Sequence, residues 1–162
     1  MKTKFLFFIA VLLMACNTDY TPKPKAFIKL DFPDKVYEKL DADCPFSFEV
    51  PVYSQLGLKG NSCLMDLSFP QQKAVLYVSY FTLDNNLEAH TQQSQKLAYK
   101  HNVVVDAIRE QQYINDSLKV YGMLYEYDGI SATSTQFYLT DSLNHFLRGA
   151  LYFNTEVNDS IL

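Results

Sequence analysis

The chain has 162 residues with a formal net charge of −4 at pH 7, and it contains 12 Tyr and 12 Phe but no Trp. This length fits one domain with a hydrophobic core. The acidic balance argues against nucleic acid, or an anionic lipid surface, as a partner bound through charge. Many aromatic residues with few Gly and Pro favour a folded domain rich in strands.

The N-terminus has the pattern of a bacterial lipoprotein leader. Lys2 and Lys4 precede an apolar run over 5–14, which is too short to span a bilayer as a helix and fits a cleaved signal peptide. Residues 13–16 (LMAC) resemble the bacterial lipobox. We therefore expect cleavage after residue 15 and acylation of Cys16, palmitate included, which holds the mature chain at a membrane outside the cytoplasm. The alternative is an ordinary secretory peptide with a chance cysteine.

Cleavage would remove both N-terminal lysines and take the formal net charge from −4 to −6. Residues 16–43 are predicted to form a lipidated tether, because Pro22 and Pro24 favour an extended spacer. A poorly ordered N-terminus is the alternative. Residues 44–162 are predicted to form a single α+β domain. We expect it to be truncated, because 158–160 is typical of the start of a helix.

Alternation of apolar and polar side chains predicts strands through most of the domain. One helix is predicted over 86–101, where Asn85 and Glu88 resemble a capping box and apolar residues recur on one face. The predicted fold is a largely antiparallel sheet with this helix on one face and a second helix beyond the C-terminus. Residues 57–61 are predicted to be a loop. The predicted strands are 27–33, 46–50, 63–69, 74–81, 103–108 with a continuation at 112–114, 118–127, 131–140 and 145–154.

Two cysteines remain besides Cys16. Cys44 and Cys63 are an even pair in an oxidising compartment, which favours a disulfide. The predicted topology argues against it, since the two cysteines begin consecutive strands. In a plain hairpin the starts of two strands lie at opposite ends, beyond bridging distance. Free thiols are therefore the alternative.

The sequence has no cluster of residues with catalytic or metal-ligand spacing. Its three histidines are far apart, and no HExxH, CxxC, EF-hand, GxSxG or phosphate-loop motif occurs. Glu49 and Asp66 could form a carboxylate pair for acid–base chemistry in a hydrolase, but their alternation also fits a solvated strand face. We therefore expect neither an enzyme nor a bound metal or cofactor.

Arg148 stands out because it lies inside an apolar predicted strand. It could form a structural ion pair with Glu126, two strands earlier, or the charges could lie on a solvated face. It could instead receive an acidic group of a partner. Tyr121 and Tyr125 belong to a Tyr-rich face that suits a sugar or a peptide, although such faces more often belong to a core. These four residues are the predicted docking residues.

Three Asp-Ser-apolar triplets contain Ser117, Ser142 and Ser160. Asp and Ser both bond the local backbone, so the triplets are typical of turns. They also resemble the O-glycosylation sites that some Bacteroidetes use in exported proteins, which makes the three serines candidates for glycans.

Several stretches of the chain resemble the gliding motility lipoprotein GldD family, and they run in order across nearly the whole mature chain. The resemblance implies a role in surface gliding of Bacteroidetes and in the linked type IX secretion machinery. It carries over no catalytic residues, and it implies further residues after Leu162. The stretches are 20–25, 31–33, 44–49, 97–101, 120–126, 137–142 and 145–154.

These inferences together predict a lipid-anchored, non-catalytic component of the gliding apparatus that docks other proteins of the cell envelope. The alternative is a periplasmic lipoprotein that binds a glycan or a peptide. Residues after Cys16 lack the acidic cluster that is linked to surface export in this group, so we expect the domain to face the periplasm.

Overall fold

The computed structural model describes residues 34–40, 42–59, 63–129 and 131–154. Apart from Asp34, these residues belong to the second of the two units into which the chain divides, Lys35–Leu162. The predicted signal peptide, the lipidation site Cys16, the strand expected over 27–33 and the helix start expected at 158–160 lie outside the described residues.

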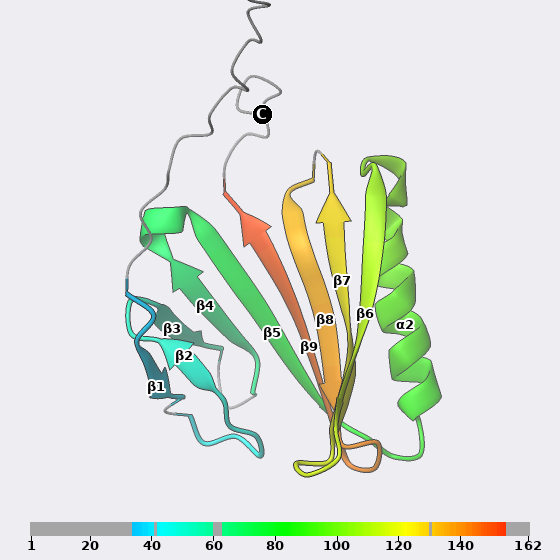
Figure 1. Cartoon of the computed structure of the whole chain (residues 1–162). Coiled ribbons are helices and arrows are strands. Elements are labelled where there is room, and N and C mark those ends of the chain that lie inside the picture. Colours follow the sequence, from blue (N-terminus) through cyan, green and yellow to red (C-terminus); the bar gives the residue numbers. More distant parts are fainter. Residues whose placement is uncertain (1–33, 41, 60–62, 130, 155–162) are drawn as a thin grey trace, which may run out of the picture. The chain divides into compact units, whose positions relative to one another are not determined.

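One antiparallel sheet of seven strands forms the body of the described domain (Figure 1). A separate antiparallel pair contains β1 and β2, and the helical segments are η1, α2 and η2. The sheet order is β3 (Gln55–Leu58), β4 (Met65–Phe69), β5 (Ala74–Thr82), β9 (His145–Phe153), β8 (Thr133–Thr140), β7 (Val120–Asp128) and β6 (Ala107–Asn115). The other elements are β1 (Tyr37–Lys39), β2 (Glu49–Pro51), η1 (Pro70–Gln72), α2 (Leu87–Tyr99) and η2 (Lys100–Val103).

The two faces of the sheet carry separate cores. On the N-terminal face, Met65, Leu67 and Val78 are buried against Leu40 and Val50 from the segment 40–50. Successive side chains of a strand point to opposite faces, so the neighbours of these residues belong to the other face. We call that other side the helix face, because α2 packs there.

Close contacts between small helix residues and tyrosine side chains of the sheet hold α2 on the helix face. Its buried residues, Ser94 and Ala98, are one turn apart, which gives the helix a narrow inner stripe. Ala98 packs against Tyr125 and Tyr127, and the Tyr127 hydroxyl donates a hydrogen bond to the Ala98 carbonyl at 3.1 Å. The narrow stripe is sufficient because alanine lets the backbone of α2 approach two tyrosine rings.

Within the described ranges, the structure confirms a mostly antiparallel sheet with one α-helix. The capping box predicted at Asn85 is wrong: Asn85 has a positive φ of 52°, and the residue before the helix is Asn86, whose side chain makes no capping hydrogen bond. The strand predicted from 103 begins only at Ala107, because η2 continues the helical path to Val103. The predicted loop 57–61 begins inside β3.

Only the end of the strand predicted over 46–50 is paired, as β2. Phe46 and Phe48 alternate with polar residues because both rings pack against the core of the N-terminal face. Their rings stack on each other at 6.1 Å between centroids. The alternation therefore records burial of one side of the segment, not hydrogen bonding in the sheet. β1 lies within 16–43, the range predicted for the tether.

Gly122 is required by the close approach of β7 to β8. A Cβ atom at this position would clash with the Tyr138 carbonyl oxygen and lie 2.8 Å from Cδ2 of Leu139. Because the first obstacle is backbone of the adjacent strand, relief requires the two strands to separate. We expect Gly122→Ala to lower the free energy of unfolding by about 1–3 kcal/mol, measured by urea denaturation. Gly57→Ala is the control, since its Cβ would meet only the Asp66 carbonyl at 3.6 Å; equal losses in both variants would contradict the explanation.

Candidate functional site

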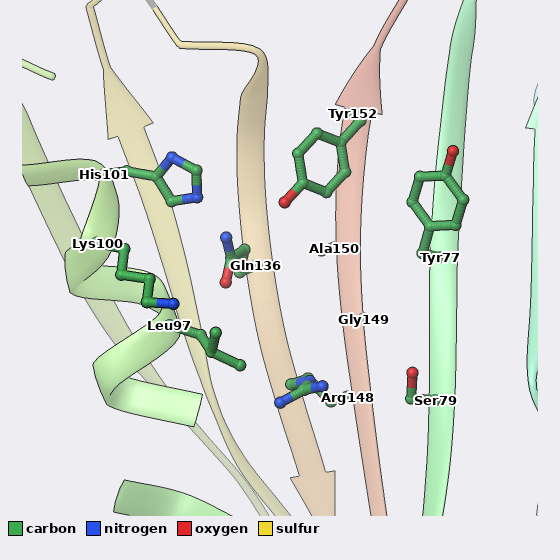
Figure 2. A pocket seen from close by; sticks show the side chains of 10 residues that line it. All are labelled: Tyr77, Ser79, Leu97, Lys100, His101, Gln136, Arg148, Gly149, Ala150 and Tyr152. Carbon is green, nitrogen blue, oxygen red and sulfur yellow. The ribbon is translucent and has the colours of Figure 1, made fainter. Parts of the chain in front are cut away.

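A pocket of about 470 Å³ opens on the helix face, between the end of α2 and the strands β5, β9 and β8. Figure 2 shows that side chains from the sheet and from the end of the helix point into the same space. The residues that give the pocket its chemistry are Tyr77, Gln136, Arg148 and Tyr152 from the sheet, with Lys100 and His101 from η2.

The strand register creates the pocket by placing a small residue between larger ones. Ala150 on β9 is opposite Tyr77 on β5 and opposite Gln136 on β8. Its methyl side chain leaves room that a longer side chain would fill. Arg148 and Tyr152 are two residues away on either side and therefore face the same way. The Tyr77 and Tyr152 rings meet edge to face, with centroids 5.8 Å apart.

Arg148 is the central cation of the pocket. Its guanidinium lies 5.7 Å from the centre of the Phe81 ring, and it forms no ion pair with a carboxylate of the described residues. Burial lowers the pKa of Arg148, while the nearby Tyr152 hydroxyl acts in the opposite direction. Arginine nevertheless stays charged in proteins, so this half-buried cation lacks a counter-charge from the described chain.

The other charged groups of the pocket are also basic. Lys100 is exposed at its rim, and no Asp or Glu lines it. Burial lowers the pKa of His101, whose ring lies 5.3 Å from the Tyr127 ring. Beside the pocket, Lys59 pairs with Asp66 at 2.8 Å. Since the lowered pKa favours a neutral His101 and Lys59 is paired, the positive charge at the pocket comes from Arg148 and Lys100. In a chain of net charge −4, these two residues make a local positive site suited to an anionic group.

The family model described as "Gliding motility lipoprotein GldD" matches residues 17–162. The chain belongs to this family. The GldD family is named for gliding motility and for a lipoprotein, which associates the chain with gliding and with a membrane of the cell envelope. No curated protein and no solved structure matches it. Within the part of this GldD-family chain that the structure describes, no helix has the length and apolar character needed to cross a membrane.

The predicted pairing of Arg148 with Glu126 is wrong, because the two side chains point to opposite faces of the seven-stranded sheet. Arg148 is opposite Tyr138, which is opposite Met123, so residues of β7 with odd numbers share its face. Glu126 faces the other way and lies 4.0 Å from the guanidinium of Arg109. The absence of this pair leaves Arg148 available to a ligand.

The predicted docking surface at the β7 tyrosines is also wrong at Tyr125. This side chain is only 4% exposed, because α2 covers it, and burial raises its pKa to about 12. Tyr121 is half-buried, and its hydroxyl donates a hydrogen bond to Asp116 at 3.3 Å. The tyrosines that reach the pocket are Tyr77 and Tyr152. The sequence signals them only through their alternation in strands, which does not reveal the register that brings them together.

Cys44 and Cys63 form a disulfide, with their Cα atoms 5.8 Å apart. The topological objection to this bond does not apply, because Cys44 does not lie in a strand paired with β4. It lies in the segment that packs across the N-terminal face. The disulfide therefore fastens this segment to the residues that lead into β4.

Two of the Asp-Ser-apolar triplets lie in turns. Asp141 accepts hydrogen bonds from the backbone N–H groups of residues 143, 144 and 145 at 3.0, 2.9 and 2.8 Å. Ser142 has a positive φ of 70° in this turn. Ser117 is in the β6–β7 turn, and both serines are exposed, whereas Ser160 lies outside the described residues.

The predicted acid–base pair is not brought together by the sheet. Asp66 is on β4 and pairs with Lys59, whereas Glu49 is in β2, outside the seven-stranded sheet. Among the described residues, no group of three or more His, Cys, Asp or Glu side chains is arranged to hold a metal ion.

Proposed function

We propose that this GldD-family lipoprotein is a non-catalytic docking component of the gliding apparatus and of the linked type IX secretion machinery. In this proposal, acyl chains on Cys16 hold it at the membrane, residues that follow form a tether, and a single domain faces the periplasm. The leader pattern and the family support the anchor and the association with gliding. The basic pocket on the helix face supports docking through an acidic group of a partner protein.

The observation that carries the docking proposal is Arg148, half-buried and without a carboxylate partner among the described residues. A guanidinium binds a carboxylate through two parallel hydrogen bonds, which gives strength and orientation. Lys100 at the rim would add attraction, and the amide of Gln136 could donate to the same group. The proposed ligand is therefore a carboxylate of another envelope protein, from a side chain or a chain terminus.

Arg148→Gln tests this proposal in cells. A photo-crosslinking residue in place of Tyr77, at the pocket, should capture a partner protein when Arg148 is present. We expect Arg148→Gln to reduce the captured partner by about tenfold or more, since a hydrogen bond to a charged group contributes roughly 1.5–3 kcal/mol. The melting temperature of the Arg148→Gln variant should stay close to that of the unchanged protein, because the substitution removes no described ion pair.

Arg109→Gln is the matched control, because Arg109 is an exposed arginine of the same sheet that pairs with Asp128 at 3.2 Å. It should leave the capture at Tyr77 unchanged. Capture and gliding that survive Arg148→Gln would contradict the docking proposal.

A glycan- or peptide-binding lipoprotein is the second candidate, favoured by the aromatic pair of Tyr77 and Tyr152 beside Arg148. Aromatic faces stack on sugar rings, and the guanidinium would select an acidic sugar or peptide. Titration of the full chain with acidic oligosaccharides and with acidic peptides separates this candidate from docking of a folded partner. Glycans on Ser117, Ser142 or Ser160 remain a further proposal, because two of these serines are accessible in turns.

A further inference from the structure

In the part of the chain that the structure describes, no strand pairs with the outer edge of β6, which is nine residues long. β6 is the last strand in the sheet order and pairs only with β7, over nine residues from Ala107 to Asn115 and without a shift in register. No described backbone hydrogen bond reaches β6 from its other side. Such an edge presents a row of free N–H and C=O groups that can pair with another strand.

β6 has only some of the features by which proteins protect exposed edges: Arg109 and Glu110 carry charge, but the strand is long and its pairing with β7 has no bulge. It contains neither Pro nor Lys, and the strand at the opposite edge, β3, has only four residues. Two apolar side chains near its end are in contact with solvent, Tyr113 and Ile114, the latter 58% exposed. We propose that β6 pairs antiparallel with β6 of a second copy of this chain, so that one sheet continues across a two-fold dimer.

The sequence of β6 is complementary to itself in the register that pairs the whole strand. With the two-fold axis at Gln111, Ile108 of one copy is opposite Ile114 of the other, and Glu110 is opposite Gln112. Both pairs occur twice and lie on the helix face, because they have even numbers. Opposite side chains of an antiparallel pair come within contact distance, so the exposed Ile114 would pack on the half-buried Ile108.

The other face is equally compatible. Arg109 would be opposite Tyr113, which allows the guanidinium to lie over the ring, and Gln111 would meet its own copy. No like charges stand opposite each other in this register. This cross-strand complementarity favours a second copy over an unrelated strand as the occupant of the edge.

Cysteine crosslinking of the full-length lipoprotein in its membrane tests the register. Gln111→Cys should form a disulfide-linked species of twice the chain mass, since residue 111 meets itself. Arg109→Cys and Tyr113→Cys should each stay uncrosslinked alone and should crosslink when the two variants are co-expressed. Gln71→Cys, exposed in η1, is the control and should give none of this species.

A second measurement uses the mass of the purified full chain in detergent. Ile114→Asp should weaken the dimer by about tenfold or more, because two apolar cross-strand pairs are lost. Leu118→Asp, at a side chain that is 71% exposed just beyond β6, should leave the dimer intact. A monomer at all concentrations, or Gln111→Cys linked to a protein of different mass, would overturn the proposal. Whether the dimer forms does not depend on the docking role proposed for Arg148, because Arg148 is on β9 and two strands separate β9 from β6.

Discussion

Phe146→Ala is expected to lower the free energy of unfolding by about 3–5 kcal/mol, the range for removing a buried aromatic side chain. Phe146 is on β9, and its side chain is 1% exposed. Its ring stacks on Tyr138 with centroids 5.2 Å apart and lies 5.2 Å from the ring of His90. The substitution removes one of the aromatic contacts between the helix and the sheet, and it leaves a cavity that the neighbouring side chains fill only in part.

Chemical denaturation followed by circular dichroism measures this loss. Native domains are stable by about 5–15 kcal/mol, so the variant should unfold at a much lower denaturant concentration. Phe153→Ala is the matched control at the end of the same strand, where the side chain is 36% exposed. If Phe153→Ala lowered the free energy of unfolding as much as Phe146→Ala, the contacts of Phe146 with Tyr138 and His90 would not explain the loss.

Removing the disulfide with Cys44→Ser and Cys63→Ser together is expected to cost about 3 kcal/mol in the chain-entropy model. The two cysteines are 19 residues apart, so the bond restricts a loop of moderate length in the unfolded chain. In the folded chain it keeps Leu40 and Val50 on the core of the N-terminal face.

Unfolding of the unchanged protein with and without a reductant provides the control. The reduced protein should match the double-serine variant, because both lack the same bond. A double variant as stable as the oxidised protein would show that packing alone holds the segment 40–50 in place.

The sequence predicts the long elements because their determinants are local. β5, β7, β8, β9 and α2 each show enough alternation or helical periodicity to be located within a few residues. The short strands β1 and β3 are missed, because three or four residues carry little periodicity and their pairing depends on distant partners. Cys44 illustrates the same limit, since its bond depends on how the preceding segment crosses the sheet.

The candidate site is predictable only at its centre. Arg148 is conspicuous in the sequence as a cation inside an apolar strand. Its surroundings come from the register, which places Tyr77 and Gln136 on either side of Ala150, and from the point where α2 ends, which brings in Lys100. The same register places Arg148 and Glu126 on opposite faces of the sheet. The sequence alone could not exclude an ion pair between them.

In the proposed anchoring, acyl chains hold the protein by its N-terminus beside moving machinery, and the position of the Cys44–Cys63 bond then has a mechanical consequence. Of the described elements, β1 is the nearest to that end along the chain, so force applied there would load β1 before the others and could peel it from β2. Peeling would then stop at Cys44, because the covalent link passes the load directly to the residues before β4. The sheet and its pocket would thus keep their shape while the leading residues absorb the extension.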